Sequence, residues 1–80
     1  MRFELFSQVA LARDVPEKAL QAGDVATIVE YHPAMSGQDG YTLEVFDAVG
    51  ETLAVLTLAE SELEELRAGE VLSVRALATT

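Results

Sequence analysis

The chain has 80 residues, half of them hydrophobic, and carries a net charge of −9 from fourteen acidic and five basic side chains. This length supports one small core, so we expect a single domain over residues 1–80. The absence of cysteine excludes disulfides and thiolate metal sites. The charge disfavours nucleic acid as a partner, because such binding depends on basic side chains that neutralise phosphates. A basic protein partner suits the charge, although charge of this kind also simply keeps a small protein soluble.

The sequence predicts no membrane association. Its apolar runs are too short to span a bilayer. The first six residues mix charged and aromatic side chains and lack the apolar core of a signal peptide. We therefore expect a cytoplasmic protein of bacterial type.

The first half of the chain predicts two strands separated by a long loop. An apolar run over residues 9–12 indicates the first strand, and the β-branched residues within 25–31 indicate the second. Between them, the segment 14–24 contains Pro16 and Gly23, which interrupt regular structure. The segment 32–40 is rich in Pro, Ser, Gly and Asp and is expected to form the next turn.

The following two strands are predicted over residues 41–45, which alternate between apolar and polar, and over residues 52–58. In the latter strand, Leu53 and Val55 are expected on one face and Leu56 on the opposite face. Apolar side chains on an outward face, or an unpaired edge strand, would invite pairing with another chain. The alternative is that the residues before the first strand cover that face within the same molecule.

Near the end of the chain, the spacing of the apolar residues changes from that of a strand to that of a helix. Ser61 followed three residues later by Glu64 matches a capping box at the start of a helix. Leu63 and Leu66 are three residues apart, as on one face of a helical turn. Residues 71–77 are then predicted to form the last strand.

Five short strands, a long first loop and one short helical turn before the last strand predict a mostly β fold, a small five-stranded SH3-like barrel that is partly open. Residues 8–29 contain Val-Ala-Leu, an acidic-x-Pro pattern, Leu-x-x-Gly-Asp and Thr-Ile-Val, and residues 41–58 contain Thr-Leu-Ala-x-Leu-Thr-Leu. These motifs resemble the small bacterial family called domain of unknown function 4926. The resemblance implies an SH3-like fold and brings no activity, cofactor or catalytic residue. Ala26 departs from the pattern, since similar sequences often have Gly there, and predicts ordinary β conformation.

No arrangement of side chains predicts an enzyme or a bound cofactor. His32 is the single histidine, and a metal site would need further ligands, for which Glu30 and Asp39 are the nearest candidates. The simpler interpretation is a solvent-facing histidine in a loop. Ser61 has no general base at a recognisable spacing. We therefore expect a protein that is not an enzyme and holds no metal or cofactor.

Acidic residues are concentrated late in the chain, at Glu60, Glu62, Glu64, Glu65 and Glu70. Like charges three or four apart on a helical turn repel each other by about 0.2–0.5 kcal/mol per pair. A cationic partner would relieve this repulsion, and a solvated face is the plainer explanation. A Ca²⁺ site is not expected, because the alternating ligand spacing of an EF-hand loop is missing.

These observations favour a protein-binding module, in its most specific form an acidic protein of the immunity or antitoxin kind that masks a basic partner. Self-association into a homo-oligomer is another use for exposed apolar surface. The alternative is a barrel that binds a small ligand or nucleic acid through the loops 14–24 and 32–40. Polyproline binding is not expected, because the chain has no Trp and its aromatic residues are scattered. The predicted partner-binding residues are Glu60, Glu62, Glu64, Glu65, Phe46 and Leu56.

Overall fold

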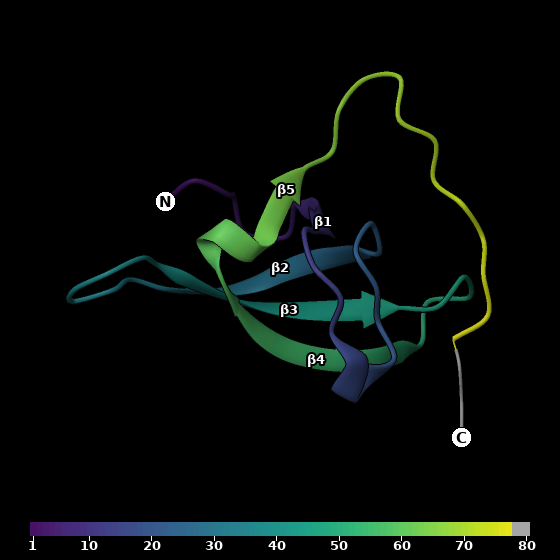
Figure 1. The fold of residues 1–80 in the computed structure, drawn as a ribbon, viewed down its shortest axis with the longest axis horizontal. Helices are drawn as coiled ribbons and strands as arrows, with labels where there is room; N and C mark the ends of the chain where they lie inside the picture. The colour runs from purple at the N-terminus through teal and green to yellow at the C-terminus, as the bar shows by residue number, and fades with distance from the viewer. Residues whose placement is uncertain (78–80) are drawn as a thin grey trace.

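The computed structural model describes residues 1–77, and its framework is one five-stranded antiparallel sheet (Figure 1). The order across the sheet is β4-β3-β2-β1-β5, so β4 and β5 form its two edges and the sheet is not closed. This confirms the predicted mostly β, five-stranded and partly open architecture. The strands are β1 (Gln8–Leu11), β2 (Val25–His32), β3 (Gly40–Phe46), β4 (Thr52–Ala59) and β5 (Leu63–Glu65).

Two short 3-10 turns are the helical elements among residues 1–77. The first, η1 (Pro16–Lys18), lies in the long loop after β1, and the second, η2 (Glu60–Glu62), leads into β5. In the part of the chain that the structure describes, no helix is long and apolar enough to cross a membrane.

Every second side chain of the sheet enters a common core, as the period of a strand requires. Beyond the sheet, Phe3 packs edge-on against Tyr41 with 5.5 Å between ring centroids. The Tyr41 hydroxyl oxygen accepts hydrogen bonds from the backbone N–H groups of Arg2 (3.0 Å) and Phe3 (3.3 Å). The residues before β1 therefore cover one end of the core within the same molecule. The core comprises Phe3, Val9, Leu11, Val15, Leu20, Ala26, Ile28, Tyr41, Leu43, Val45, Ala54, Leu56, Leu58 and Leu63.

The faces of β4 are separated as predicted, but the outward face is the other one. Leu56 is only 8% exposed and pairs with the buried Leu43, whereas Val55 is 51% exposed and Leu53 43% exposed. A shift of one residue in register would exchange the two faces, and the pairing with β3 decides between them. The expectation that Leu56 lies on a binding surface is therefore wrong.

The last strand is not where the sequence predicts it. Leu63–Glu65 occupies the free edge of β1, with Leu63 opposite Leu11, while residues 71–77 are extended but belong to no strand. Leu63 lies directly after η2, so it reaches the edge of β1 before the later segment can. A strand needs a partner as well as a favourable composition.

The helical turn also begins earlier than predicted. It starts at Glu60, which places Ser61 inside the turn rather than at its cap. The carboxylate of Glu62, not Glu64, reaches back and accepts the N–H of Ala59 at 2.9 Å. The capping interaction is thus shifted by two residues.

The long loop between β1 and β2 is held by its own acidic side chains. Asp14 Oδ1 accepts the N–H of Ala22 at 2.9 Å, and Asp24 Oδ2 accepts the N–H of Gln21 at 2.8 Å. Gly23 has a φ of +92°, which L side chains rarely adopt, and it closes the turn between these groups. At the start of β2, Ala26 lacks a positive φ, so the ordinary β conformation predicted for it is confirmed.

Two neighbouring residues of β4 test the assignment of its faces. Leu56→Ala should lower the free energy of unfolding by about 2–5 kcal/mol, because it leaves a cavity in the core. Val55→Ala should cost no more than about 1 kcal/mol, because its side chain is already half in water. Urea unfolding of both variants at pH 7 measures the difference, and a larger loss for Val55 would reverse the faces.

Candidate binding groove

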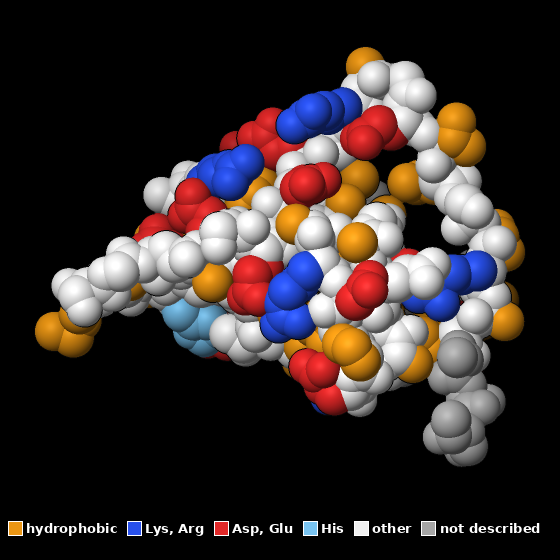
Figure 2. Space-filling view, viewed as in Figure 1, with side chains coloured by type: hydrophobic (Ala, Val, Ile, Leu, Met, Phe, Trp, Pro, Cys, Tyr) orange, Lys and Arg blue, Asp and Glu red, His pale blue; other side chains and the backbone are white. Residues whose placement is uncertain are grey.

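A groove of about 860 Å³ lies between the sheet and the segment that follows β5. Residues 71–77 form one wall of it, and we call this segment the strap. The opposite wall comes from the start of β2, the end of β3 and the turn between β3 and β4. The strap arches away from the body before returning to it (Figure 1), and Figure 2 shows an opening beneath the arch.

The apolar part of the groove comes from side chains that the sheet directs outward. Phe46 follows the buried Val45 in β3, so alternation turns its ring away from the core, and it remains 43% exposed. Leu53 is exposed for the same reason in β4, and Val49 stands at the tip of the turn between them. Exposed apolar residues that gather in one concave place indicate a binding surface more than scattered ones do.

Asp47 builds the turn that presents Val49. Its Oδ1 accepts the N–H groups of Val49 (3.0 Å) and Glu51 (2.9 Å), and its own N–H donates to the carbonyl of Glu51 at 2.8 Å. Gly50 has a φ of +89°, as a tight hairpin turn requires. The turn is therefore an ordered wall of the groove.

Three carboxylates, those of Asp24, Glu44 and Asp47, also line the groove. Glu44 accepts a hydrogen bond from the hydroxyl of Thr52, and Asp47 accepts N–H groups of its own turn, whereas Asp24 contacts the strap. Among residues 1–77, Arg75 is the basic side chain in the lining, so without the strap the groove is acidic and apolar.

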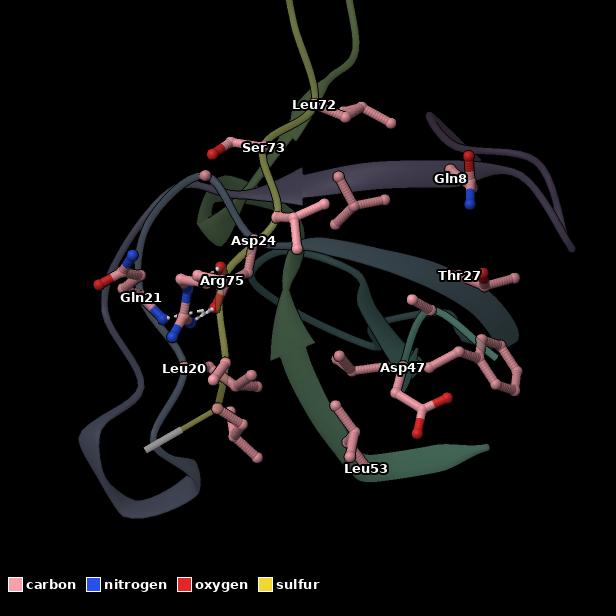
Figure 3. A pocket seen from close by; sticks show the side chains of 18 of the residues that line it. Gln8, Leu20, Gln21, Asp24, Thr27, Asp47, Leu53, Leu72, Ser73 and Arg75 are labelled. Atoms are coloured by element: carbon pink, nitrogen blue, oxygen red, sulfur yellow. Dashed lines mark hydrogen bonds and ion pairs between the residues drawn. The ribbon is translucent and has the colours of Figure 1, made fainter. Parts of the chain in front are cut away.

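Arg75 of the strap pairs with Asp24 of the loop before β2 (Figure 3). Its Nε donates to Oδ1 at 3.1 Å and its Nη2 donates to Oδ2, so both carboxylate oxygens are engaged. The side chain of Asp24 is 17% exposed and that of Arg75 31% exposed. The hydrogen bond to Asp24 raises the pKa of Arg75 above its ordinary value, and partial burial acts in the opposite direction.

The predicted acidic patch does not form one binding surface. Glu62 is engaged internally, because its carboxylate caps the Ala59 N–H and pairs with Arg13. The backbone hydrogen bond from Ala59, followed by the one from Arg13, holds the pKa of Glu62 below its ordinary value. Glu64 and Glu65 are exposed neighbours in β5, and successive residues of a strand point to opposite faces. Charges on a short edge strand also discourage pairing with another sheet.

Of the other predicted partner-binding residues, Phe46 lies in the groove, Leu56 lies in the core and Glu60 is half-buried at the start of η2. The groove residues that sequence reasoning did not single out include Asp47, Leu53 and Arg75, while Asp24 entered only as part of the loop 14–24. The position of an acidic residue beside Gly or at the end of a strand gives no sign of what its side chain faces.

His32 ends β2 and is not a loop residue. Its Nε2 lies 2.6 Å from the hydroxyl of Thr42 and 3.6 Å from a carboxylate oxygen of Glu30. Asp39, the other candidate ligand, accepts instead the Tyr31 hydroxyl at 2.7 Å, and this hydrogen bond raises the pKa of Tyr31 to about 12. Within residues 1–77, no group of three or more potential ligands is arranged to hold a metal ion.

Comparison with known proteins identifies the family. Residues 5–65 match the model described as Domain of unknown function (DUF4926), and the chain belongs to this family. The match starts just before β1 and ends with β5, so it includes Asp24 and Phe46 while the strap lies beyond it. No curated protein and no solved structure matches the chain. The name SH3-like therefore stays a prediction, while the open five-stranded sheet is observed.

Glu62→Gln separates the structural role of this residue from general charge effects. A carboxylate whose pKa is lowered by folding stabilises the protein above its ordinary pKa, and this stabilisation is lost as the pH falls through the lowered value. The variant should therefore unfold at lower urea concentration than the parent at pH 7, and the difference should shrink as the pH falls below the ordinary pKa of a glutamate.

Glu64→Gln is the matched control, because Glu64 is exposed on β5. Its urea midpoint should stay unchanged or rise slightly as the negative charge falls. Equal losses in the two variants at pH 7 would contradict the role assigned to Glu62.

Proposed function

We propose that this chain is a protein-binding module, without catalytic activity of its own, that holds an extended cationic and aliphatic segment of a partner protein in the groove. The observation that carries the proposal is the composition of the groove. Exposed apolar side chains lie beside carboxylates in one concave surface, and the framework around them is the part of the chain that matches the family.

The charge of the chain supports a basic partner. A net charge of −9 on 80 residues creates a long-range field that speeds the approach of a cationic protein. The groove then supplies short-range contacts of two kinds, carboxylates for basic groups and the Phe46 and Leu53 side chains for aliphatic ones. The partner is thus defined by chemistry, a basic segment with aliphatic residues close to its charges.

The more specific form of the proposal is an acidic protein that masks a basic partner, in the manner of an immunity protein or antitoxin, in a bacterial cytoplasm. Its support is the acidic charge on a small single-sheet scaffold. It requires a tight complex of fixed stoichiometry. Self-association remains the other use proposed for the exposed apolar residues of β4.

A small molecule is the second candidate occupant, because a volume of about 860 Å³ is within the range of ligand pockets. The loop 14–24 contributes to the groove through residues 20–24, but no residue of the segment 32–40 lines it. We therefore propose the small-molecule alternative for the groove alone, and not for a site that both loops form together.

An NMR titration of the ¹⁵N-labelled protein tests the proposal. The probe is an acetylated and amidated peptide, Gly-Val-Leu-Arg-Val-Lys-Gly, added to millimolar concentration. We expect chemical-shift changes at Phe46, Val49 and Leu53, and weaker binding as salt screens the charges. Shift changes confined to residues 60–65 would place the binding site at η2 and β5 instead of the groove. The absence of any shift change would contradict the proposal.

Phe46→Ser should weaken binding of this peptide by about tenfold, because it removes an aromatic anchor from the groove. Val55→Ser is the matched control, since Val55 is exposed to a similar degree on β4 but does not line the groove. Its affinity should equal that of the parent. Equal weakening by the two substitutions would show that the peptide binds outside the groove.

A further inference from the structure

The Asp24 carboxylate is positioned by the fold and not by the strap. Its Oδ2 accepts the N–H of Gln21 at 2.8 Å, its own N–H donates to the Gln21 carbonyl at 3.0 Å, and its carbonyl accepts the N–H of Leu11 at 2.9 Å. These contacts join the loop to β1 and fix the carboxylate at the rim of the groove. The Asp24 carboxylate that receives the Arg75 guanidinium is thus held by contacts that do not involve the strap.

The strap meets this receptor through alternate residues. In an extended segment, residues two apart point to the same side. Arg75 pairs with Asp24 and Leu77 is half-buried and packs against the core, whereas Val74, which precedes Arg75, is 94% exposed. The strap thus uses an Arg-x-Leu pattern to hold the groove.

The strap is held weakly apart from these two anchors. Within residues 1–77, its backbone makes no hydrogen bond to the sheet, and Val71 and Leu72 remain largely exposed. An ion pair that is partly exposed adds little stability and is screened by salt. A segment with two side-chain anchors and free backbone groups can be displaced.

The receptor and its occupant also lie in different parts of the chain relative to the family match. Asp24, Phe46 and Leu53 lie inside the region that matches the family, whereas the strap lies beyond its end at residue 65. The receptor residues therefore lie within the matched region, and the strap lies outside it.

From these observations we infer that the strap is a built-in ligand, and that a partner binds by replacing it with its own extended Arg-x-aliphatic sequence. This inference rests on the proposed function and specifies the partner. Arg is required rather than Lys, because the Asp24 carboxylate receives two N–H groups of one planar guanidinium. The aliphatic residue two positions later takes the place of Leu77.

The tether makes the strap an effective competitor. A segment joined by a short linker acts at an effective concentration of about millimolar. A partner then binds with an apparent dissociation constant raised by the reciprocal of the fraction of molecules whose groove is free. Cationic segments that bind the groove only weakly or non-specifically therefore do not displace the strap.

The full-length double variant Arg75→Glu with Leu77→Ser tests the inference, because it removes both anchors. The probe is an acetylated and amidated peptide with the strap's own sequence, Val-Leu-Ser-Val-Arg-Ala-Leu, and its affinity is measured by NMR titration and calorimetry. The double variant should bind it at least about tenfold more tightly than the parent. Arg75→Ala alone, which leaves the second anchor in place, should shift the affinity in the same direction by a smaller factor.

Arg67→Glu with Val55→Ser is the matched control. It makes the same change in net charge and also removes one aliphatic side chain, from an exposed position of β4 that does not line the groove. Its affinity for the peptide should equal that of the parent. A gain as large as that of the Arg75 and Leu77 variant would assign the effect to charge alone and overturn the inference.

The other outcomes distinguish the two proposals. Equal affinity of the parent and the double variant for the peptide would overturn the inference that the strap is a built-in ligand. The groove would remain a binding site. Absence of binding to either protein at millimolar peptide would overturn the proposed function as well. Light scattering gives a further outcome, in which the parent is a dimer and the double variant has the monomer mass of 8.6 kDa. This outcome would show that the strap binds the groove of a second copy, and it would overturn displacement within one molecule.

Discussion

Each strand of a single sheet buries every second side chain, and in this molecule that constraint decides which apolar residues form the core and which stay outside. Ile28, Leu43 and Leu56 lie in one row across β2, β3 and β4, and all three are buried. The same register turns Phe46 and Leu53 outward. The apolar part of the groove is thus a consequence of how the core is built, because a small domain leaves a large share of its apolar surface uncovered.

The acidic side chains have a structural use that the net charge conceals. Several carboxylates accept backbone N–H groups in loops, in turns or at the end of a strand, namely Asp14, Asp24, Asp39, Asp47, Glu62 and Glu70. Loops between strands contain N–H groups that no ladder satisfies, and carboxylates are strong acceptors for them. Part of the charge therefore orders the connections, and the remaining exposed carboxylates, such as Glu64 and Glu65, determine the field around the molecule.

Asp24 connects these two uses. It accepts a backbone N–H within its loop and also presents its carboxylate to the groove, where Arg75 of the strap meets it. A group that is held by its own loop is pre-organised for a ligand, so less ordering is needed when the ligand binds. The position of the strap beyond the family match separates the receptor from its present occupant. This separation is the reason for regarding the groove as a site and the strap as a segment that occupies its Asp24 end.

The sequence by itself determined the mostly β fold, the positions of β1 to β4, the turn residues and the acidic character, because all of these depend on local composition and on periods of a few residues. It also placed Phe46 on the surface. The outward face of β4, the choice of Leu63–Glu65 as the fifth strand and the internal engagement of Glu62 were decided by the tertiary structure. So was the pairing of Asp24 with Arg75, which are 51 residues apart. Each of these depends on register or on contacts between distant segments, and β4 in particular is so uniformly apolar that its own sequence does not distinguish its two faces.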